Sequence, residues 1–232
     1  GAMKEIYRKC FQKMQKNGQY LSHLYPFEEN YYRRYGYDVS CQGAKWEIPV
    51  EKLSMKKSGK NVYYDGSEEM KQDIKNVFDI FSKDKNMMIL FDENAWEKFF
   101  EEHAPFSGLN SYVHYNDAEE PDGFMSYSPK DNGDLPQNMV VDRIWYKNIA
   151  GLKGSLSYFL TQKPYCDKLI VDLPCGVDIS AFINSTGGWG KRDCQRIVKN
   201  YGLSRVIDVE KILEIAKIQG DGCVTIKIKD DQ

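Results

Sequence analysis

The spacing of the apolar residues changes near residue 110, and this change restricts the fold more than any other feature of the sequence. Over residues 67–82 and 95–102, apolar side chains recur every three or four positions, which is typical of amphipathic helices. Beyond this point they tend to alternate with polar ones, which predicts half-buried strands. We predict consecutive strands at residues 110–115, 123–128 and 139–145, separated by polar turns that contain Gly and Pro.

The segments that follow continue the mixture of helix and strand. In chain order we expect a helix over residues 147–162, a strand over 166–173, a short helix over 178–184, a strand over 195–200, a helix over 208–218 and a strand over 223–228. Strands interleaved with helices favour a sheet that is covered by helices. The predicted fold class is therefore α+β, with α/β layers built around a mixed β-sheet.

Residues 1–50 read as a shorter version of the same order. The expected elements are a helix over 3–17 that ends at Gly18, a strand over 20–24, helical turns over 27–34 that Gly36 ends, and strand-like stretches over 37–50. Residues 51–60 are rich in lysine and serine, so we interpret them as a linker or an exposed loop. From the element order we infer that the chain holds one and a half copies of a related unit.

The composition excludes several classes of partner. The chain has 232 residues, enough for one large or two small domains, with 41% hydrophobic and 28% charged residues. A net charge of −2 provides no basic surface for nucleic acid or an anionic membrane, so we expect neither as a partner. No run of about 18 apolar residues occurs, so we expect no membrane span.

The sequence predicts a cytoplasmic protein without a metal site. Gly1-Ala2-Met3 resembles the remnant of an expression tag rather than a signal peptide, and we expect the natural chain to begin upstream. The six cysteines and three histidines lack the spacing of metal ligands. We therefore expect reduced thiols, as in other cytosolic proteins.

The most informative short segment is residues 24–38, LYPFEENYYRRYGYD, which holds six aromatic residues and one glycine. Its part YYRRYGYD is similar to the Y-x-x-x-G-[FY] signature of the GNAT acetyltransferases, at the end of their fourth helix. More narrowly, it resembles the Eis-type (enhanced intracellular survival) acetyltransferases. In those, a similar sequence follows a helix, a turn that ends in glycine and a short strand. Residues 3–18, 20–24 and 31–37 match that order.

Further stretches support the narrower resemblance. Residues 142–145 and 168–174 resemble parts of the second, degenerate GNAT domain of that family. Residues 202–209 resemble the segment that leads into its third domain, which is like a sterol carrier protein. The resemblance implies the C-terminal half of a first GNAT domain at 1–50, a degenerate second GNAT domain at 51–204, and the start of a sterol-carrier-like domain at 205–232.

The resemblance implies a reaction, the transfer of acetyl from acetyl-CoA to a primary amine. The acceptor would be a small amine, an aminoglycoside-like compound or a lysine side chain. The resemblance assigns Tyr32 the role of general acid toward the departing thiolate, whereas composition alone would make it one packing aromatic beside Tyr31 and Tyr35. Arg33 and Arg34 would hold a nearby phosphate or acidic group. Eis-type proteins often form closed rings, so the resemblance is compatible with a homo-oligomer, while the sequence itself does not determine the oligomeric state.

The sequence departs from the family pattern in the groups that bind coenzyme A. A loop close to R-x-x-G-x-G normally binds pyrophosphate at a helix start, and it is absent before residues 3–17. The terminal carboxylate that acts as general base in Eis-type enzymes is also absent. Without the loop and this base, we expect a fragment that binds coenzyme A weakly or not at all. Residues 145–153 have no arginine and no close glycine pair, so we predict no coenzyme A binding by the second copy. Tyr25 stands where many members carry asparagine, and it is a candidate cofactor contact.

Other features have both a simple and a functional interpretation. Residues 187–190, GGWG, lack a phosphate-loop pattern and favour a flexible turn. His103 and His114 lie near the acidic run 117–122, so they are either structural histidines or part of a catalytic dyad. The acidic run is either a solvated hairpin turn or an attraction for a cationic amine. The alternative function is a non-catalytic module that assembles or binds a lipid or a partner.

Overall fold

The computed structural model describes residues 1–83, 85–130, 136–184, 194–217 and 220–229. The chain divides into two compact units, one formed by residues 1–42 and 199–232 and the other by residues 43–198. The predicted boundaries were placed after residues 50 and 204. The first unit thus joins both ends of the chain, which the order of elements did not indicate. The correspondence of these units to family domains stays a prediction.

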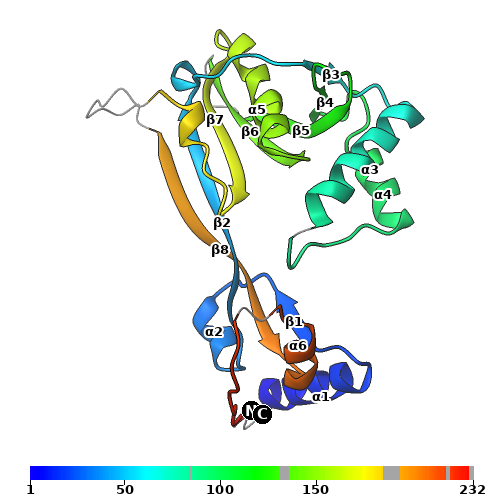
Figure 1. Ribbon diagram of the computed structural model, residues 1–232, viewed down its shortest axis with the longest axis vertical. Helices are drawn as coiled ribbons and strands as arrows, with labels where there is room; N and C mark the ends of the chain where they lie inside the picture. The colour runs from blue at the N-terminus through cyan, green and yellow to red at the C-terminus, as the bar shows by residue number, and fades with distance from the viewer. Residues whose placement is uncertain (84, 131–135, 185–193, 218–219, 230–232) are drawn as a thin grey trace. The chain divides into compact units, whose positions relative to one another are not determined.

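The first unit combines part of the sheet with the helices α1, α2 and α6 (Figure 1). Its described elements are α1 (Ala2–Lys16), β1 (Leu21–Leu24), α2 (Glu29–Arg33), the start of β2 (Asp38–Pro49), the end of β8 (Gln195–Val206) and α6 (Val209–Ile215). β1 pairs with β8 in antiparallel register, and the strand order here is β1-β8-β2. Phe11, Tyr37 and Leu203 form the buried core of the unit.

The second unit holds the larger part of the sheet. Its described elements, after β2, are β3 (Lys60–Tyr63), α3 (Glu68–Lys83), α4 (Glu93–Glu102), β4 (Asn110–Tyr115), β5 (Pro121–Lys130), β6 (Gln137–Tyr146), α5 (Ile149–Leu156) and β7 (Cys166–Pro174). The strand order is β2-β7-β6-β5-β4-β3. β6 and β7 are parallel, whereas β2–β7, β3–β4, β4–β5 and β5–β6 are antiparallel, so the sheet is mixed.

Helices cover both faces of the sheet in the second unit (Figure 1). Phe124 of β5 contacts Phe99 of α4, with ring centroids 5.6 Å apart. The preceding residue, Gly123, lies against Ser155 of α5. Because successive strand residues point to opposite faces, α4 and its neighbour α3 form one layer and α5 forms the other.

Most predicted helices and strands are confirmed, and so is the α+β class with a mixed sheet. The apolar positions predicted to face inward on α3 are all buried: Met70, Ile74, Val77, Phe78 and Phe81. Gly18 and Gly36 have φ angles of 72° and 77°, in the left-handed region. Glycine enters this region without the penalty that a side chain imposes, which explains why the chain turns at these positions.

Some predictions in the C-terminal part of the chain are wrong. Residues 223–228 form no strand, and Val224 is 81% exposed, because alternation makes a strand only where a partner strand is available. The helix predicted over residues 208–218 spans Val209–Ile215, and the side chain of Leu213 in it is exposed. β8 continues to Val206 instead of ending at residue 200, since its last residues pair with β1. The turn predicted at residues 187–190 and the last residue of the helix predicted over 208–218 fall outside the described residues.

Two predicted helices are shorter than expected. The α-helical part of 147–162 spans Ile149–Leu156 and continues as a 3₁₀ helix over Ser157–Thr161. The segment 178–184 contains a single 3₁₀ turn, Ser180–Phe182. Within the described ranges, no helix has both the length and the apolar character needed to cross a membrane.

Candidate active site around Tyr32

Tyr32 lies near the end of α2, a short helix that follows Pro26 in the chain. The Glu28 carboxylate caps the start of this helix, accepting hydrogen bonds from the backbone N–H groups of Asn30 (3.1 Å) and Tyr31 (2.7 Å). The Tyr32 side chain is half-buried and packs against the core of the first unit. The predicted catalytic residue is therefore held by a capped helix and by the core behind it.

Aromatic rings surround the phenol of Tyr32. Its ring centroid is 5.3 Å from that of Phe27, 5.2 Å from that of Tyr31 and 6.1 Å from that of Tyr37, all in edge-on arrangements. Phe27 is 76% exposed, so this side of the site reaches the surface. Within the described part of the chain, no group hydrogen-bonds the Tyr32 hydroxyl. The hydroxyl is thus available to a substrate as donor or acceptor.

The turn after α2 fixes the backbone of Tyr32. The N–H groups of Tyr35 and Tyr37 both donate to the Tyr32 carbonyl, at 2.8 and 3.4 Å, and the Gly36 N–H donates to the Arg33 carbonyl at 3.1 Å. The left-handed Gly36 reverses the chain so that it enters β2. The predicted helix end at Gly36 therefore turns the chain so that the Tyr37 ring packs against the phenol.

Arg205 of β8 contacts the same turn, although 170 residues separate it from Tyr35. Its Nη1 donates to the Tyr35 carbonyl at 2.7 Å, and its guanidinium carbon lies 4.4 Å from the centroid of the Phe11 ring. The residue is only 7% exposed. Arg205 was not predicted as a site residue, because its only signal in the sequence is a charge at an inward position of a strand whose full length was not predicted.

The other residues proposed for this site lie apart from the phenol or are engaged elsewhere. The Arg33 guanidinium pairs with Asp38 at 3.1 Å and with Glu29 at 3.5 Å. A hydrogen bond from the Val39 N–H, together with Arg33, holds the pKa of the Asp38 carboxyl below its usual value. Arg33 is thus already neutralised by protein carboxylates. Tyr25 is 73% exposed and is not among the rings that contact Tyr32.

Two neighbouring phenols of the first unit are kept neutral by burial. Burial raises the pKa of Tyr7 to about 12, and it also raises the pKa of Tyr37. Tyr7 stacks on Tyr35 with ring centroids 4.1 Å apart, and the Tyr37 hydroxyl hydrogen-bonds the Ser22 hydroxyl at 2.7 Å. These phenols are engaged in packing and in a buried hydrogen bond, which distinguishes them from Tyr32.

The histidines form no exposed catalytic dyad. His103 Nδ1 donates to the Phe99 carbonyl at 2.8 Å, and its Nε2 lies 3.2 Å from the Ser126 hydroxyl. His114 pairs with Asp122, and these two side chains are almost fully buried. The interpretation of the acidic run as a solvated turn is therefore wrong for Asp122, which the sheet and α5 cover. In the described part of the chain, no cluster of three or more His, Cys, Asp or Glu has metal-binding geometry.

Comparisons with known proteins identify the fold. The sequence profile of the acetyltransferase (GNAT) domain matches residues 1–40, the segment that contains Tyr32. Eis1 from Mycobacterium abscessus superposes with a TM-score of 0.70 at 15% identity, over 92% of this chain and 54% of that one. The fold is that of the GNAT acetyltransferases. No curated protein matches the sequence.

Other solved structures share this GNAT fold. A conserved protein of unknown function from Enterococcus faecalis V583 has a TM-score of 0.72 at 16% identity, covering 91% of this chain and 52% of that one. A GCN5-related N-acetyltransferase from Anabaena variabilis has a TM-score of 0.65 at 15% identity, covering 90% of this chain and 51% of that one. The chain thus spans about half the length of the structures that it matches.

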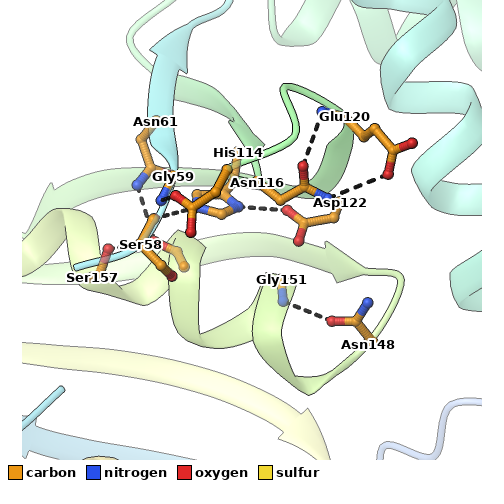
Figure 2. A network of polar contacts seen from close by, with 12 residues as sticks. Ser58, Gly59, Asn61, His114, Asn116, Glu120, Asp122, Asn148, Gly151 and Ser157 are labelled. Atoms are coloured by element: carbon orange, nitrogen blue, oxygen red, sulfur yellow. Dashed lines mark hydrogen bonds and ion pairs between the residues drawn. The ribbon is translucent and has the colours of Figure 1, made fainter. Parts of the chain in front are cut away.

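The GNAT resemblance places a second coenzyme A loop at the start of α5. Protein groups already bind the backbone there (Figure 2). The Asn148 side chain accepts a hydrogen bond from the Gly151 N–H at 3.0 Å. The Lys147 N–H donates to the Asp122 carbonyl at 2.9 Å. A Cβ on Gly151 would lie 2.2 Å from the Asp122 carbonyl oxygen, so the helix start rests directly on the hairpin. That this copy does not bind coenzyme A stays a prediction, and this geometry agrees with it.

Proposed function

We propose that the natural protein containing this chain is an acetyl-CoA-dependent N-acetyltransferase, of Eis type, in which Tyr32 is the general acid. One observation carries the proposal. The Tyr32 hydroxyl has no hydrogen-bond partner within the described residues, and it lies in the segment that matches the acetyltransferase (GNAT) domain. The exposed ring of Phe27 beside it offers an apolar contact for a substrate.

The chemistry requires one proton donor and one proton acceptor. The lone pair of a neutral primary amine attacks the thioester carbon of acetyl-CoA, so that a C–N bond forms and the C–S bond breaks. The electron pair of the broken bond stays on sulfur, and the Tyr32 hydroxyl gives its proton to this thiolate. Phenols and thiols have similar acidity, so this transfer is nearly balanced. The amine nitrogen loses its extra proton to water or to a general base, and water then restores the phenol.

The acceptor is proposed to be a polyamine, an aminoglycoside-like compound or a lysine side chain. Exposed aromatic rings attract cationic groups through their negative faces. Phe27 and Tyr25, both largely exposed, suit an acceptor that carries further ammonium groups besides the reacting amine. The assignment of residues 205–232 to a sterol-carrier-like domain also remains a proposal.

The test replaces Tyr32 by Phe in the natural protein, which keeps the ring and removes only the hydroxyl. Release of the coenzyme A thiol is measured with spermidine, kanamycin or a lysine-containing peptide as acceptor. With the fastest acceptor we expect kcat to fall by about 100-fold or more, the usual contribution of a general acid. The matched variant is Tyr31→Phe, on the same helix, whose ring contacts that of Tyr35 with centroids 5.5 Å apart. We expect its kcat to change by less than about threefold.

Two outcomes would contradict the proposal. The first is a Tyr32→Phe variant whose kcat stays within about twofold of the wild type. The second is the absence of thiol release with all three acceptors.

A further inference from the structure

We propose that Arg205 is a positioning residue for Tyr32, which holds the turn that carries the phenol. The inference rests on the proposed role of Tyr32. It adds a residue from the far end of the chain, which neither the tyrosine motif nor the matched segment 1–40 contains.

The first argument is a chain of backbone hydrogen bonds. Arg205 Nη1 donates to the Tyr35 carbonyl at 2.7 Å, and the Tyr35 N–H donates to the Tyr32 carbonyl at 2.8 Å. The guanidinium therefore binds the same tight turn whose other hydrogen bonds end on Tyr32. A charged donor makes a stronger hydrogen bond to a carbonyl than a neutral one does, which makes Arg205 a firm anchor.

The second argument is the room that the turn leaves for the guanidinium. A Cβ on Gly36 would lie 1.9 Å from Arg205 Nη1, so a larger residue at this position would force the guanidinium to move. On its other side the guanidinium faces the Phe11 ring, with 4.4 Å between the guanidinium carbon and the ring centroid. The group is thus held between α1 and the turn, while β8 provides its backbone.

The third argument is a second path to the phenol. Arg205 lies opposite Ser22 in the register of β8 and β1, and the Ser22 hydroxyl bonds the Tyr37 hydroxyl at 2.7 Å. The Tyr37 ring contacts the Tyr32 ring, with centroids 6.1 Å apart. Arg205 is therefore next to both sets of contacts that hold the phenol in place. One is the backbone hydrogen bonds through Tyr35, and the other is the packing of the Tyr37 ring against Tyr32.

Position matters for a general acid because the phenol must come within hydrogen-bond reach of the sulfur. A displacement of about 1 Å lowers a rate by about 100-fold in a well-oriented site. A buried guanidinium also carries a desolvation cost that an apolar residue avoids. We infer that the main effect of Arg205 is on the placement of Tyr32, in addition to any effect on stability.

The test is a double-mutant cycle in the natural protein, with the thiol-release assay. Arg205→Met is made in the wild type and in the Tyr32→Phe variant. In the wild type we expect kcat to fall by about 10- to 100-fold, while KM for acetyl-CoA changes by less than about threefold. In the Tyr32→Phe variant we expect the same substitution to change kcat by less than about twofold, because no phenol remains to be positioned.

A matched variant and a milder one accompany the cycle. Arg8→Met removes an exposed arginine of the same unit, paired with Glu5, and should leave kcat unchanged. Arg205→Lys keeps a charged donor, so it serves as the test variant if Arg205→Met fails to fold. We expect its kcat loss to be smaller and again confined to the background that contains Tyr32.

The outcomes separate the two proposals. If Tyr32→Phe lowers kcat and the Arg205 variants lower it equally in both backgrounds, Arg205 has only a structural role and the positioning proposal is overturned. Unchanged kcat in the Arg205 variants overturns it as well. If Tyr32→Phe itself leaves kcat unchanged, the general-acid assignment fails, and the role of Arg205 fails with it.

Discussion

His114 and Asp122 form a buried pair, in which Nδ1 of the imidazole lies 2.5 Å from a carboxylate oxygen (Figure 2). The side chains are 1% and 7% exposed. On the other side of the ring, Nε2 donates to the Ser58 carbonyl at 2.9 Å. Both ring nitrogens thus face acceptor oxygens. The pair joins the β4–β5 hairpin to the loop that precedes β3, directly beneath α5.

Removing the carboxylate from this pair should destabilise the protein strongly. In Asp122→Ala the buried imidazole loses a hydrogen-bond partner that nothing replaces, and we expect the free energy of unfolding to fall by about 3 kcal/mol. The matched variant is Asp117→Ala, in the same hairpin, where an exposed carboxylate accepts a hydrogen bond from the Gly59 N–H. Its loss should be about 1 kcal/mol or less. Urea denaturation measures both, and equal losses would contradict the burial of the pair.

Gly154 of α5 should not tolerate alanine, although alanine favours helices. A Cβ at this position would lie 2.2 Å from Cε1 of the His114 ring, which is itself buried. We expect a net loss of about 2 kcal/mol in Gly154→Ala, because the overlap outweighs the gain of about 1 kcal/mol in helix propensity. At Gly176, nothing lies within 4 Å of a Cβ, so Gly176→Ala should be neutral within about 0.5 kcal/mol. Thermal unfolding of the two variants tests this difference.

Alanine variants of Gly36 and Gly18 distinguish the energetic cost of losing the Arg205 contact from the cost of backbone strain. Both have positive φ, 77° and 72°, so alanine is strained at either position by about 1 kcal/mol. Only at Gly36 would the new Cβ overlap the Arg205 guanidinium. We therefore expect Gly36→Ala to cost about 2 kcal/mol more than Gly18→Ala in urea denaturation. Similar losses in the two variants would show that the guanidinium is not packed on Gly36.

His103 should make the stability of the protein decrease in mild acid. Burial lowers the pKa of His103 below its ordinary value of 6.5. In the unfolded chain the imidazole takes up a proton near pH 6.5, whereas in the folded protein it does so only at lower pH. The unfolded state then binds more protons, so stability is complete above pH 6.5 and falls as the pH decreases toward the folded pKa.

The measurement is the unfolding free energy between about pH 7.5 and 5 for the wild type and for His103→Gln. Glutamine can still hydrogen-bond, but it does not titrate. We expect the wild type to lose more stability across this range than the variant does. Parallel curves would contradict a depressed pKa.

Short-range patterns in the sequence predicted much of this fold. The helical spacing of Ile74, Phe78 and Phe81 and the alternation in β4 and β5 depend only on residues near one another in the chain. The glycines at positions 18 and 36 were likewise predictable as helix ends, because left-handed backbone is a local requirement. The segment around Tyr32 could be recognised for the same reason, since its motif is contiguous.

The remaining features required the tertiary structure. The alternation at residues 223–228 was the same kind of signal as that in β4, yet these residues form no strand, while β8 continues past its expected end because β1 lies beside it. Asp122 and Arg205 are charged residues whose burial depends on partners distant in the sequence, the imidazole of His114 across the hairpin and the Tyr35 carbonyl at the other end of the chain. Local sequence determines which conformation a segment prefers. Which charged side chains are buried, and which backbone groups they hold, is decided only when distant segments pack together, because desolvation and hydrogen bonding depend on neighbours in space.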